Sequence, residues 1–371
     1  FVAWYPITPS SSVAEAFIDS AESYRKTADG KQNYAIVQAE DELAAIGMVI
    51  GAGWAGTRAM TTTSGPGISL MAEFAGLSYF TEIPAVIWCV QRVGPSTGLP
   101  TRTMQGDITK THLLSHGDTQ HVLIIPASPE ECFEFGQTCF DLAERLQTMV
   151  FVMSDLDLGM NHWSSNEFQY PTEPYDRGKV LDAEALTKAG KFERYRDVDG
   201  DAIPYRTLPG TQHPLAAYFT RGSGHTEKAT YTEKSEDYKN LMDRLARKFE
   251  TAKKYVPKPI IDTSANSKVG IIAYGSTDFS MPEARAQLAQ QSIKTDYLRV
   301  RAIPFTDEVK SFIETHDRIY IVEQNRDAQM KELLSLAFPE YVMKIQSVLH
   351  YDGLPIDAVM ISDAIMKKEK R

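Results

Sequence analysis

Short runs that are mostly apolar, without a strict alternation of apolar and polar residues, recur along the first 155 residues of this chain. Helical patterns separate them, and they comprise residues 34–39, 58–63, 84–91, 122–127 and 149–154. Strands that are apolar on both faces are typical of a parallel sheet covered by helices on both sides. The sequence therefore predicts an α/β fold built on a doubly wound parallel sheet.

The remainder of the chain differs from this first block. A second alternating block begins near residue 268, with predicted strands at 269–274, 297–302, 318–323 and 344–348, and indicates a smaller open α/β domain. Residues 156–265 are polar and irregular except for one long charged helix, predicted at 235–254. We expect a first domain over 1–230 with an irregular extension at 156–230, a helix and linker over 231–265, and a last domain over 266–371. An irregular stretch of this length usually covers a site or makes a subunit contact.

Charge and cysteine content exclude several classes of partner and compartment. The formal net charge of −10 argues against nucleic acid or an anionic membrane surface as the main partner. Cys89, Cys132 and Cys139 show no CxxC spacing, and no Asn-x-Ser/Thr acceptor occurs, which favours a reducing cytoplasm. No apolar stretch is long enough to span a bilayer, and no signal-peptide pattern is visible. Phe1 is not a natural start, so we expect residues upstream of it.

Polar side chains follow the predicted strands where each one ends. Thr8 stands between Pro6 and Pro9, and because a proline bars the preceding residue from the helical region, its hydroxyl is displayed on a stiff strand exit. Glu40, Asp41 and Glu42 follow the strand at 34–39. One acid in a first turn commonly complements the helix dipole, but three exceed that need. The acids therefore indicate either a helix start or a site.

Two further strand exits carry groups suited to binding a ligand. Residues 64–67 read Ser-Gly-Pro-Gly, in which Gly65 and Gly67 allow close backbone approach and Pro66 sets the turn. Arg92 ends the strand at 84–91, and its planar fork suits a carboxylate, with the hydroxyl of Thr101 available nearby. Ligands of open parallel sheets bind beyond the carboxyl ends of strands. A ligand site is one interpretation, and a surface ion pair of Arg92 is the other.

Other motifs offer weaker alternatives. Residues 51–56 match a dinucleotide fingerprint but lie at the end of a predicted helix, where close packing is the simpler interpretation. Ser96 sits in a G-x-S-x-G pattern after a strand, which makes a serine hydrolase the rival enzyme class, although Gly98 and Pro100 break the helix that a nucleophile elbow needs. The histidines lack metal-ligand spacing and no phosphate-loop lysine is present, so no metal site is predicted.

Long stretches of the sequence resemble one known family. The segments YPITPSS, QAEDE, AIGMVIGAGWAGTRAMTTTSGPGISLMAEFAGL and QRVGPSTGLPTRTMQGD are similar to the α subunit of 2-oxoacid:ferredoxin oxidoreductases, which use thiamine diphosphate. The segments IPYRTLPGTQHP, YFTRGSGH and MDRLARKFETA are similar to the 2-oxoglutarate branch, also called 2-oxoglutarate synthase. The resemblance runs from Tyr5 to about Ala358, nearly the whole chain.

The resemblance implies a domain plan and a set of partners. Residues 1–230 would form a pyrimidine-binding domain, and residues 266–371 a transketolase-C-like domain. A β subunit would carry the diphosphate-binding domain, Mg²⁺ and a [4Fe–4S] cluster, and would pair with this chain as (αβ)₂. Family members often have a further γ domain or subunit, which this sequence does not contain.

The resemblance also implies an activity and residue roles. The reaction would be the oxidative decarboxylation of 2-oxoglutarate to succinyl-CoA, with coenzyme A as acyl acceptor and ferredoxin as electron acceptor, or its reverse. Glu42 would hydrogen-bond N1′ of the cofactor, with Glu40 as the alternative if the helix began one turn earlier. Residues 64–67 would contact the cofactor, and Thr8, Arg92 and Thr101 the oxoacid. Pyruvate or a branched-chain oxoacid stays open as substrate, as does the group for a distal carboxylate: Arg102, Arg221 or a β-subunit residue.

Overall fold

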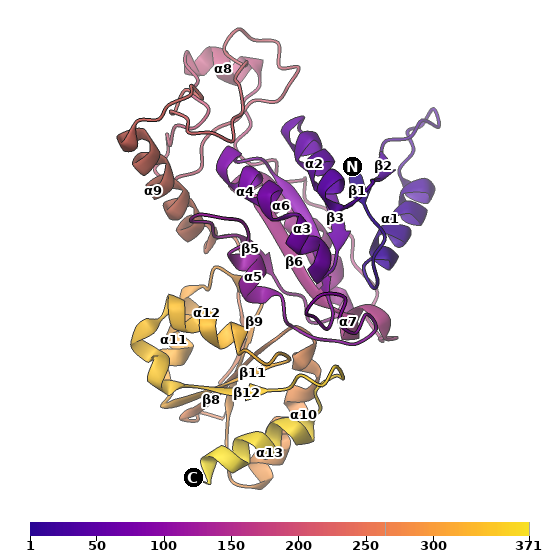
Figure 1. Ribbon diagram of the computed structural model, residues 1–371, viewed down its shortest axis with the longest axis vertical. Coiled ribbons are helices and arrows are strands. Elements are labelled where there is room, and N and C mark those ends of the chain that lie inside the picture. The colour runs from indigo at the N-terminus through magenta and orange to yellow at the C-terminus, as the bar shows by residue number, and fades with distance from the viewer. Residues whose placement is uncertain (264, 371) are drawn as a thin grey trace.

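The computed structural model describes residues 1–263 and 265–370 and contains two sheets, one above the other in Figure 1. Residues 264 and 371, in the predicted linker and at the end of the predicted last domain, lie outside the described residues. The first sheet has the strand order β10-β5-β6-β4-β3-β1-β2. Its strands are β1 (Val2–Trp4), β2 (Ile36–Gln38), β3 (Met60–Thr63), β4 (Ala85–Gln91), β5 (Val122–Ile124), β6 (Met149–Asp155) and β10 (Ala302–Ile303).

All strands of the first sheet except β10 run parallel, so their carboxyl ends share one edge. β6 is buried along its whole length and β4 along nearly all of it, as the mostly apolar runs predicted. Helices connect the strands, with α2 packed against β1, β3 and β4, and α6 against β4 and β6. These helices are α1 (Ser11–Tyr24), α2 (Glu42–Trp54), α3 (Gly65–Leu70), α4 (Ala72–Thr81), α5 (Ile108–His112) and α6 (Pro129–Leu146). The predicted doubly wound fold is confirmed.

The second sheet has the order β12-β11-β8-β9-β7, with β7 antiparallel at its edge. Its strands are β7 (Ile260–Asp262), β8 (Val269–Tyr274), β9 (Asp296–Val300), β11 (Arg318–Glu323) and β12 (Ile345–Leu349). Apolar side chains of α10 and α13 cover one face, while those of α11 and α12 cover the other in a core continuous with the first sheet. The helical elements are η1 (Gly275–Ser280), α10 (Met281–Gln290), α11 (Asp307–Thr315), α12 (Gln329–Ala337), η2 (Pro339–Lys344) and α13 (Ala358–Glu369).

Two local predictions are wrong. The predicted strand 297–302 is divided between sheets, because the chain leaves β9 after Val300 and β10 pairs antiparallel with β5 of the first sheet. The pattern Ser12-Val-Ala-Glu15, which predicts a capping box, is not used: α1 begins at Ser11, and the Ser11 hydroxyl instead accepts a hydrogen bond from the Ile7 amide at 2.9 Å.

The irregular extension lies mostly at the amino-terminal edge of the first sheet, whereas its first residues, Leu156–Met160, follow β6 at the carboxyl edge. It contains α7 (Leu156–Met160) and α8 (Ala183–Ala189), and α9 (Ser235–Ala252) follows it along one flank of the molecule (Figure 1). Arg194 donates to the carbonyl of Glu82, at 2.8 Å, just before β4 begins. Arg206 forms an ion pair of 3.2 Å with Glu144, near the start of β6. The part of the extension around Arg194 and Arg206 therefore lies at the edge opposite to the one at which the parallel strands end.

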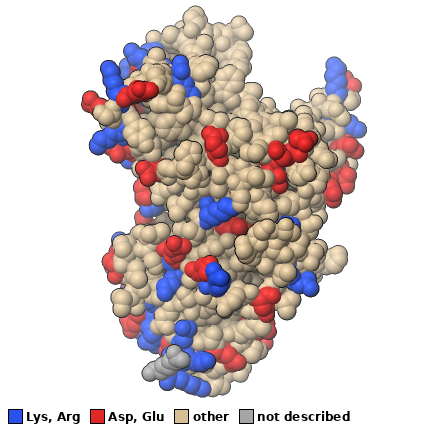
Figure 2. Space-filling model, in the orientation of Figure 1, with Lys and Arg blue, Asp and Glu red and all other residues tan. Residues whose placement is uncertain are grey.

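The surface agrees with the acidic composition. On the face shown in Figure 2, Lys and Arg atoms are interspersed with Asp and Glu atoms rather than gathered into one basic area. Among the described residues, no helix is both long enough and apolar enough to cross a bilayer.

Candidate active site

Glu42 is placed by the turn from β2 into α2. The Asp41 carboxylate caps the helix by accepting a hydrogen bond from the Ala44 amide at 2.8 Å, so α2 begins at Glu42 and not one turn earlier. Glu40 is exposed, whereas Glu42 is 6% exposed. Within the described part of the chain, the Glu42 carboxylate has no hydrogen-bond partner of its own. It is therefore an acceptor held at a helix start and available to a ligand.

The Ser-Gly-Pro-Gly turn brings backbone close to that carboxylate. Gly67 lies in α3, directly after β3, and a Cβ atom there would stand 1.9 Å from Thr63 Oγ1 and 2.9 Å from Glu42 Cγ. Only glycine permits this approach. The exits of β2 and β3 thus meet at Gly67, with Glu42 on one side of the turn.

Arg92 is linked to Ser64, the first residue of the same turn, through the Thr8 carbonyl. Its guanidinium donates a hydrogen bond to the Thr8 carbonyl, which also accepts one from Ser64 Oγ at 3.3 Å. Arg92 is 7% exposed, and its Nε has no partner in the described part of the chain. Burial lowers the pKa of Arg92, and the nearby Asp107 opposes that shift. The segments that follow β1, β3 and β4 therefore meet at the carbonyl oxygen of Thr8. In the described part of the chain, the Nε donor of Arg92 stays unpaired.

Thr8 is brought to the site, and the predicted role of its hydroxyl stays a prediction. It lies in a turn, joined to Pro9 by a cis peptide bond, and its side chain is exposed. Its carbonyl, rather than its hydroxyl, makes the contacts with Arg92 and Ser64.

A compact loop after β4 brings Thr101 back beside the end of that strand. The Val93 amide donates to the Arg102 carbonyl at 3.0 Å, and the Leu99 amide to the Val93 carbonyl at 3.2 Å. Thr101 and Arg102 are exposed beside this pairing. Arg221 lies elsewhere: its neighbour Thr220 accepts a hydrogen bond of 2.7 Å from Trp54, at the far end of α2 from Glu42.

Asp107 is a site residue that the sequence reasoning missed. A Cβ on Gly65 would stand 2.8 Å from Asp107 Oδ2, so the carboxylate lies directly against the Ser-Gly-Pro-Gly turn. Burial raises the pKa of Asp107 to about 6, although Lys110 and Arg92 oppose the rise. Asp107 precedes α5 yet does not cap it. The available signal was its place as the last residue of the segment QRVGPSTGLPTRTMQGD.

The weaker motifs have structural explanations. The chain after Ser96 stays irregular until α5 begins at Ile108, so no nucleophile elbow forms. Residues 51–56 lie at the end of α2, where a Cβ on Gly53 would stand 2.1 Å from the Pro84 carbonyl oxygen, which shows close packing. Among the described residues, no group of three or more His, Cys, Asp or Glu side chains could hold a metal ion.

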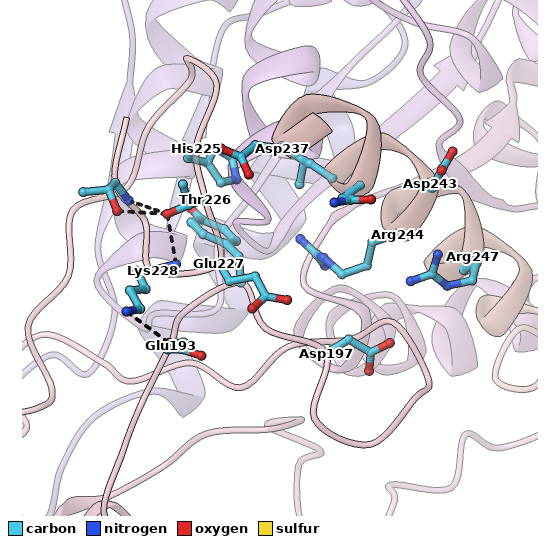
Figure 3. A pocket seen from close by; sticks show the side chains of 14 residues that line it. Glu193, Asp197, His225, Thr226, Glu227, Lys228, Asp237, Asp243, Arg244 and Arg247 are labelled. Carbon is cyan, nitrogen blue, oxygen red and sulfur yellow. Dashed lines mark hydrogen bonds and ion pairs between the residues drawn. The ribbon is translucent and has the colours of Figure 1, made fainter. Parts of the chain in front are cut away.

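A cavity of about 720 Å³ opens far from this edge, between the extension and α9 (Figure 3). Its charged groups are largely paired with one another or with neighbours. Lys228 pairs with Glu193 at 3.8 Å, and Arg244 with the buried carboxylate of Glu82. The cavity therefore brings together none of the predicted site residues.

Comparisons with known proteins identify the family of the chain. Residues 1–204 match the family described as pyruvate flavodoxin/ferredoxin oxidoreductase, thiamine diphosphate-binding. The chain is 32% identical over 381 residues to "2-oxoacid:ferredoxin oxidoreductase 2, subunit alpha" of Aeropyrum pernix, covering 99% of this chain and 57% of that relative. It is 32% identical over 335 residues to "2-oxoglutarate synthase subunit KorA" of Archaeoglobus fulgidus, covering 90% of this chain and 85% of that relative.

Two solved structures share the fold. A 2-oxoglutarate:ferredoxin oxidoreductase from Magnetococcus marinus, with 2-oxoglutarate, coenzyme A and succinyl-CoA bound, matches with a TM-score of 0.83 and 27% identity, over 99% of this chain and 61% of that chain. A split-gene transketolase matches with a TM-score of 0.51 and 11% identity, over 98% of this chain and 91% of that chain, which shows the fold alone.

The fold is α/β, and the family that matches residues 1–204 is described as thiamine diphosphate-binding. More narrowly, the chain belongs to the pyruvate flavodoxin/ferredoxin oxidoreductase family, among the α subunits of 2-oxoacid:ferredoxin oxidoreductases. The residues present fit one end of thiamine diphosphate. Glu42 offers a buried acceptor without a protein partner, and Gly65 and Gly67 keep the adjoining backbone clear of side chains.

Proposed function

We propose that this chain is the α subunit of a coenzyme A-acylating 2-oxoglutarate:ferredoxin oxidoreductase and supplies half of a thiamine diphosphate site. The observation that supports the proposal most is that Glu42 adjoins Gly67 at one end of residues 64–67, while Arg92 shares the Thr8 carbonyl with Ser64 at the other end, at the edge where parallel sheets bind ligands. The relatives named 2-oxoglutarate synthase and the Magnetococcus structure favour 2-oxoglutarate.

Glu42 and the turn beside it would hold the aminopyrimidine of the cofactor. Bound thiamine diphosphate supplies a nucleophilic carbon that adds to the 2-oxo group and accepts the electrons released by decarboxylation. Glu42 would share a proton with the ring atom N1′ and so favour the tautomer in which the exocyclic nitrogen can take up a proton. Residues 64–67 would let the ring approach the backbone. Burial of Glu42 would keep water from competing for that hydrogen bond.

Arg92 would bind the carboxylate next to the 2-oxo group. It remains cationic at neutral pH, and the Thr8 carbonyl takes one donor and fixes the orientation of the others. A fixed guanidinium reduces the entropy lost on binding and places the 2-oxo carbon for attack. Thr8 and Thr101, both exposed at the end of this cluster, would add hydroxyl contacts to the oxoacid.

Recognition of the distal carboxylate of 2-oxoglutarate needs a second cation. Arg102 is a candidate within this chain because it follows Thr101 in the loop beside the β4 exit. Arg221 does not lie near that loop, since it follows Thr220, which contacts the far end of α2. A β-subunit residue is the alternative. Without such a cation, the same site would suit pyruvate or a branched-chain oxoacid.

The proposal assigns the rest of the machinery to other chains. A β subunit would bring the diphosphate-binding domain, Mg²⁺ and a [4Fe–4S] cluster, and the assembly would be (αβ)₂. Residues 1–230 would be the pyrimidine-binding domain, 231–265 a helix and linker, and 266–371 the transketolase-C-like domain. The overall reaction converts 2-oxoglutarate and coenzyme A to succinyl-CoA, CO₂ and a proton while two ferredoxins each accept one electron.

The test is 2-oxoacid-dependent reduction of ferredoxin by the chain co-purified with its β partner. We expect turnover that requires coenzyme A and is fastest with 2-oxoglutarate rather than pyruvate or 2-oxoisovalerate. The isolated chain should show none, and full turnover by the isolated chain would contradict the half-site. Covalent labelling of Ser96 by a fluorophosphonate, with no oxoacid turnover, would favour a serine hydrolase instead.

A further inference from the structure

A buried polar network joins the two sheets behind the candidate active site. Its side chains come from the β4–α5 connection and the carboxyl ends of β6, β8 and β11. Each is 3% exposed or less, and they are Gln105, Asp155, Ser276, Thr277, Glu323, Gln324 and Asn325. Buried polar groups are costly unless their hydrogen bonds are satisfied. The proposed reaction gives this network no role, so its position needs another explanation.

Gln105 is the centre of the network. Its amide nitrogen Nε2 donates to Asp155 Oδ2 at 3.3 Å and to the Tyr274 carbonyl at 3.1 Å, and its Oε1 accepts from Thr277 Oγ1 at 3.1 Å. Its backbone amide donates to the Gln324 carbonyl at 2.8 Å. The carbonyl of Gln105 accepts from Asn325 Nδ2 at 3.1 Å. The second sheet thus holds Gln105 by both side chain and backbone.

The same network fixes the start of α12. The Glu323 carboxylate accepts hydrogen bonds from Asn325 Nδ2 and the Met330 amide, both at 2.8 Å. Asn325 Oδ1 accepts from the Gln329 amide at 3.2 Å. Gln329, the first residue of α12, is therefore anchored to β11.

Gln329 reaches back to the first sheet and holds the backbone on both sides of Asp107. Its Nε2 donates to the Gly106 carbonyl at 2.6 Å, and its Oε1 accepts from the Thr109 amide at 3.2 Å. The Asp107 amide itself donates to Gln91 Oε1 at 3.1 Å, one residue before Arg92. With those groups fixed, the Asp107 carboxylate lies against Gly65.

We propose that Gln329 is a positioning residue of the candidate active site, which holds Asp107 against the Ser-Gly-Pro-Gly turn and beside Arg92. Asp107 in that place sets how strongly Arg92 attracts an anionic ligand. A protonated Asp107 leaves the charge of Arg92 uncompensated, whereas an ionised Asp107 offsets part of it. This second step rests on the proposed role of Arg92 in binding the oxoacid carboxylate.

Few charged groups face Asp107. They are Arg92, which follows β4, and Lys110 in α5, and both favour the ionised form of Asp107. The buried thiol of Cys89 in β4 is close enough for the charge of Asp107 to act on it. From α3, the backbone of Gly65 lies against the Asp107 carboxylate. Because burial raises the pKa of Asp107 to about 6, binding of an anionic oxoacid should weaken as the pH rises through that value.

The first test does not depend on the enzyme's activity. Hydrogen–deuterium exchange of the full chain should show amides of residues 105–112 exchanging about tenfold faster in Gln329→Ala, because the Thr109 amide and the Gly106 carbonyl lose their partners. Gln287→Ala is the matched control, since within residues 1–263 and 265–370 the side chain of this α10 glutamine bonds only to Glu283 and Ser362. Equal exchange in the two variants would overturn the positioning role, even if the enzyme uses another substrate.

The second test is the pH profile of KM for 2-oxoglutarate in the complex with the β subunit. KM should rise above about pH 6 in the unmodified enzyme, and this inflection should disappear in Asp107→Asn. Gln329→Ala should move it down by about one pH unit, because a loosened carboxyl regains water. General destabilisation would not move an inflection, so an unmoved one would overturn the link between Gln329 and Asp107. Loss of oxoacid turnover throughout would reject the proposed function and leave the exchange result to decide the positioning.

Discussion

Each edge of the first sheet holds a carboxylate whose pKa is shifted by its surroundings, and the two pKa values are shifted in opposite directions. At the amino-terminal edge, Glu82 is fully buried and accepts hydrogen bonds from Arg244 at 3.0 Å and Lys248 at 2.7 Å. Burial alone would raise its pKa, but the two cations hold the pKa well below its usual range. At the carboxyl edge, Asp107 has no hydrogen bond to its carboxylate within the described chain, and its pKa is raised to about 6.

This difference separates a structural edge from the edge at which we propose that the ligand binds. At Glu82 the charges neutralise one another and attach α9 to the sheet. At the opposite edge Glu42 and Asp107 lack hydrogen-bond partners for their carboxylates in the described chain, and Arg92 keeps unused donors. An uncompensated buried charge is expensive and is retained where a ligand or a reaction needs it. Each prediction below changes one member of this comparison.

The largest effect is expected for Glu82→Gln. Removing this carboxylate leaves Arg244 and Lys248 buried without their counter-charge, which should lower the free energy of unfolding by about 3–5 kcal/mol. Chemical denaturation of the full chain measures it. Asp243→Asn is the control, because it breaks the exposed Lys239 pair and should change stability little. Equal effects of both substitutions on the free energy of unfolding would contradict the structural role of Glu82 at the amino-terminal edge.

Glu42→Gln should abolish most activity and leave the fold intact. The amide keeps the shape of the side chain but cannot share a proton with the cofactor, so turnover in the complex should fall about 10²- to 10³-fold. Glu40→Gln, at an exposed position two residues earlier, should keep activity close to that of the unmodified enzyme. The roles would be reversed if the Glu40 variant proved the defective one.

Asp107→Asn should stabilise the chain at neutral pH. A raised pKa means that the folded state binds more protons than the unfolded state between about pH 4 and 6, so the ionised carboxyl costs stability as the pH rises through 6. The variant should gain up to about 3 kcal/mol over the unmodified chain at pH 7.5, and little at pH 4. Denaturation at both pH values measures this. A gain that did not depend on pH would show that folding does not raise the pKa of Asp107.

Arg92→Ala should act mainly on substrate affinity. Losing a charge-assisted pair of hydrogen bonds costs about 1.5–3 kcal/mol, so KM for the oxoacid should rise about 10- to 100-fold. Arg92→Lys should recover part of this, because it restores the charge without the planar fork. Steady-state kinetics of the complex would show it, and an unchanged KM in both variants would mean that the oxoacid carboxylate binds elsewhere.

The smallest effect is expected for Ser96→Ala. Ser96 lies exposed in the loop after β4, without the helix that a nucleophilic serine requires. Oxoacid turnover should therefore change less than about twofold, within the range of ordinary surface substitutions. A loss of turnover as large as that of Glu42→Gln would contradict this and would favour a catalytic role for Ser96.

Sequence patterns identified where the strands end but not how the ends touch. The apolar runs placed Glu42, Ser64 and Arg92 after parallel strands, and parallel strands share an edge, so their gathering was predictable. The atoms that meet were not: Arg92 contacts the Thr8 carbonyl, 84 residues away, and no local pattern encodes a backbone acceptor at that separation.

Asp107 and β10 illustrate the same limit. Asp107 directly precedes the short helix α5, and the backbone on both sides of it is bonded to Gln329, 222 residues later in the second sheet unit. The crossing of Ala302 and Ile303 into the first sheet depends on an open edge at β5, which the sequence of 297–302 does not reveal. Residue pattern determines local structure, whereas these contacts follow from tertiary packing.

The distance between the Glu42 carboxylate and N1′ of thiamine diphosphate, measured in an experimental structure of the chain with its β subunit, cofactor and 2-oxoglutarate, tests the account most directly. We expect a hydrogen bond of about 2.6–3.0 Å there, with the oxoacid carboxylate on Arg92 across residues 64–67. A cofactor ring bound away from Glu42, or an oxoacid held by other cations while Arg92 stays on the Thr8 carbonyl alone, would contradict it.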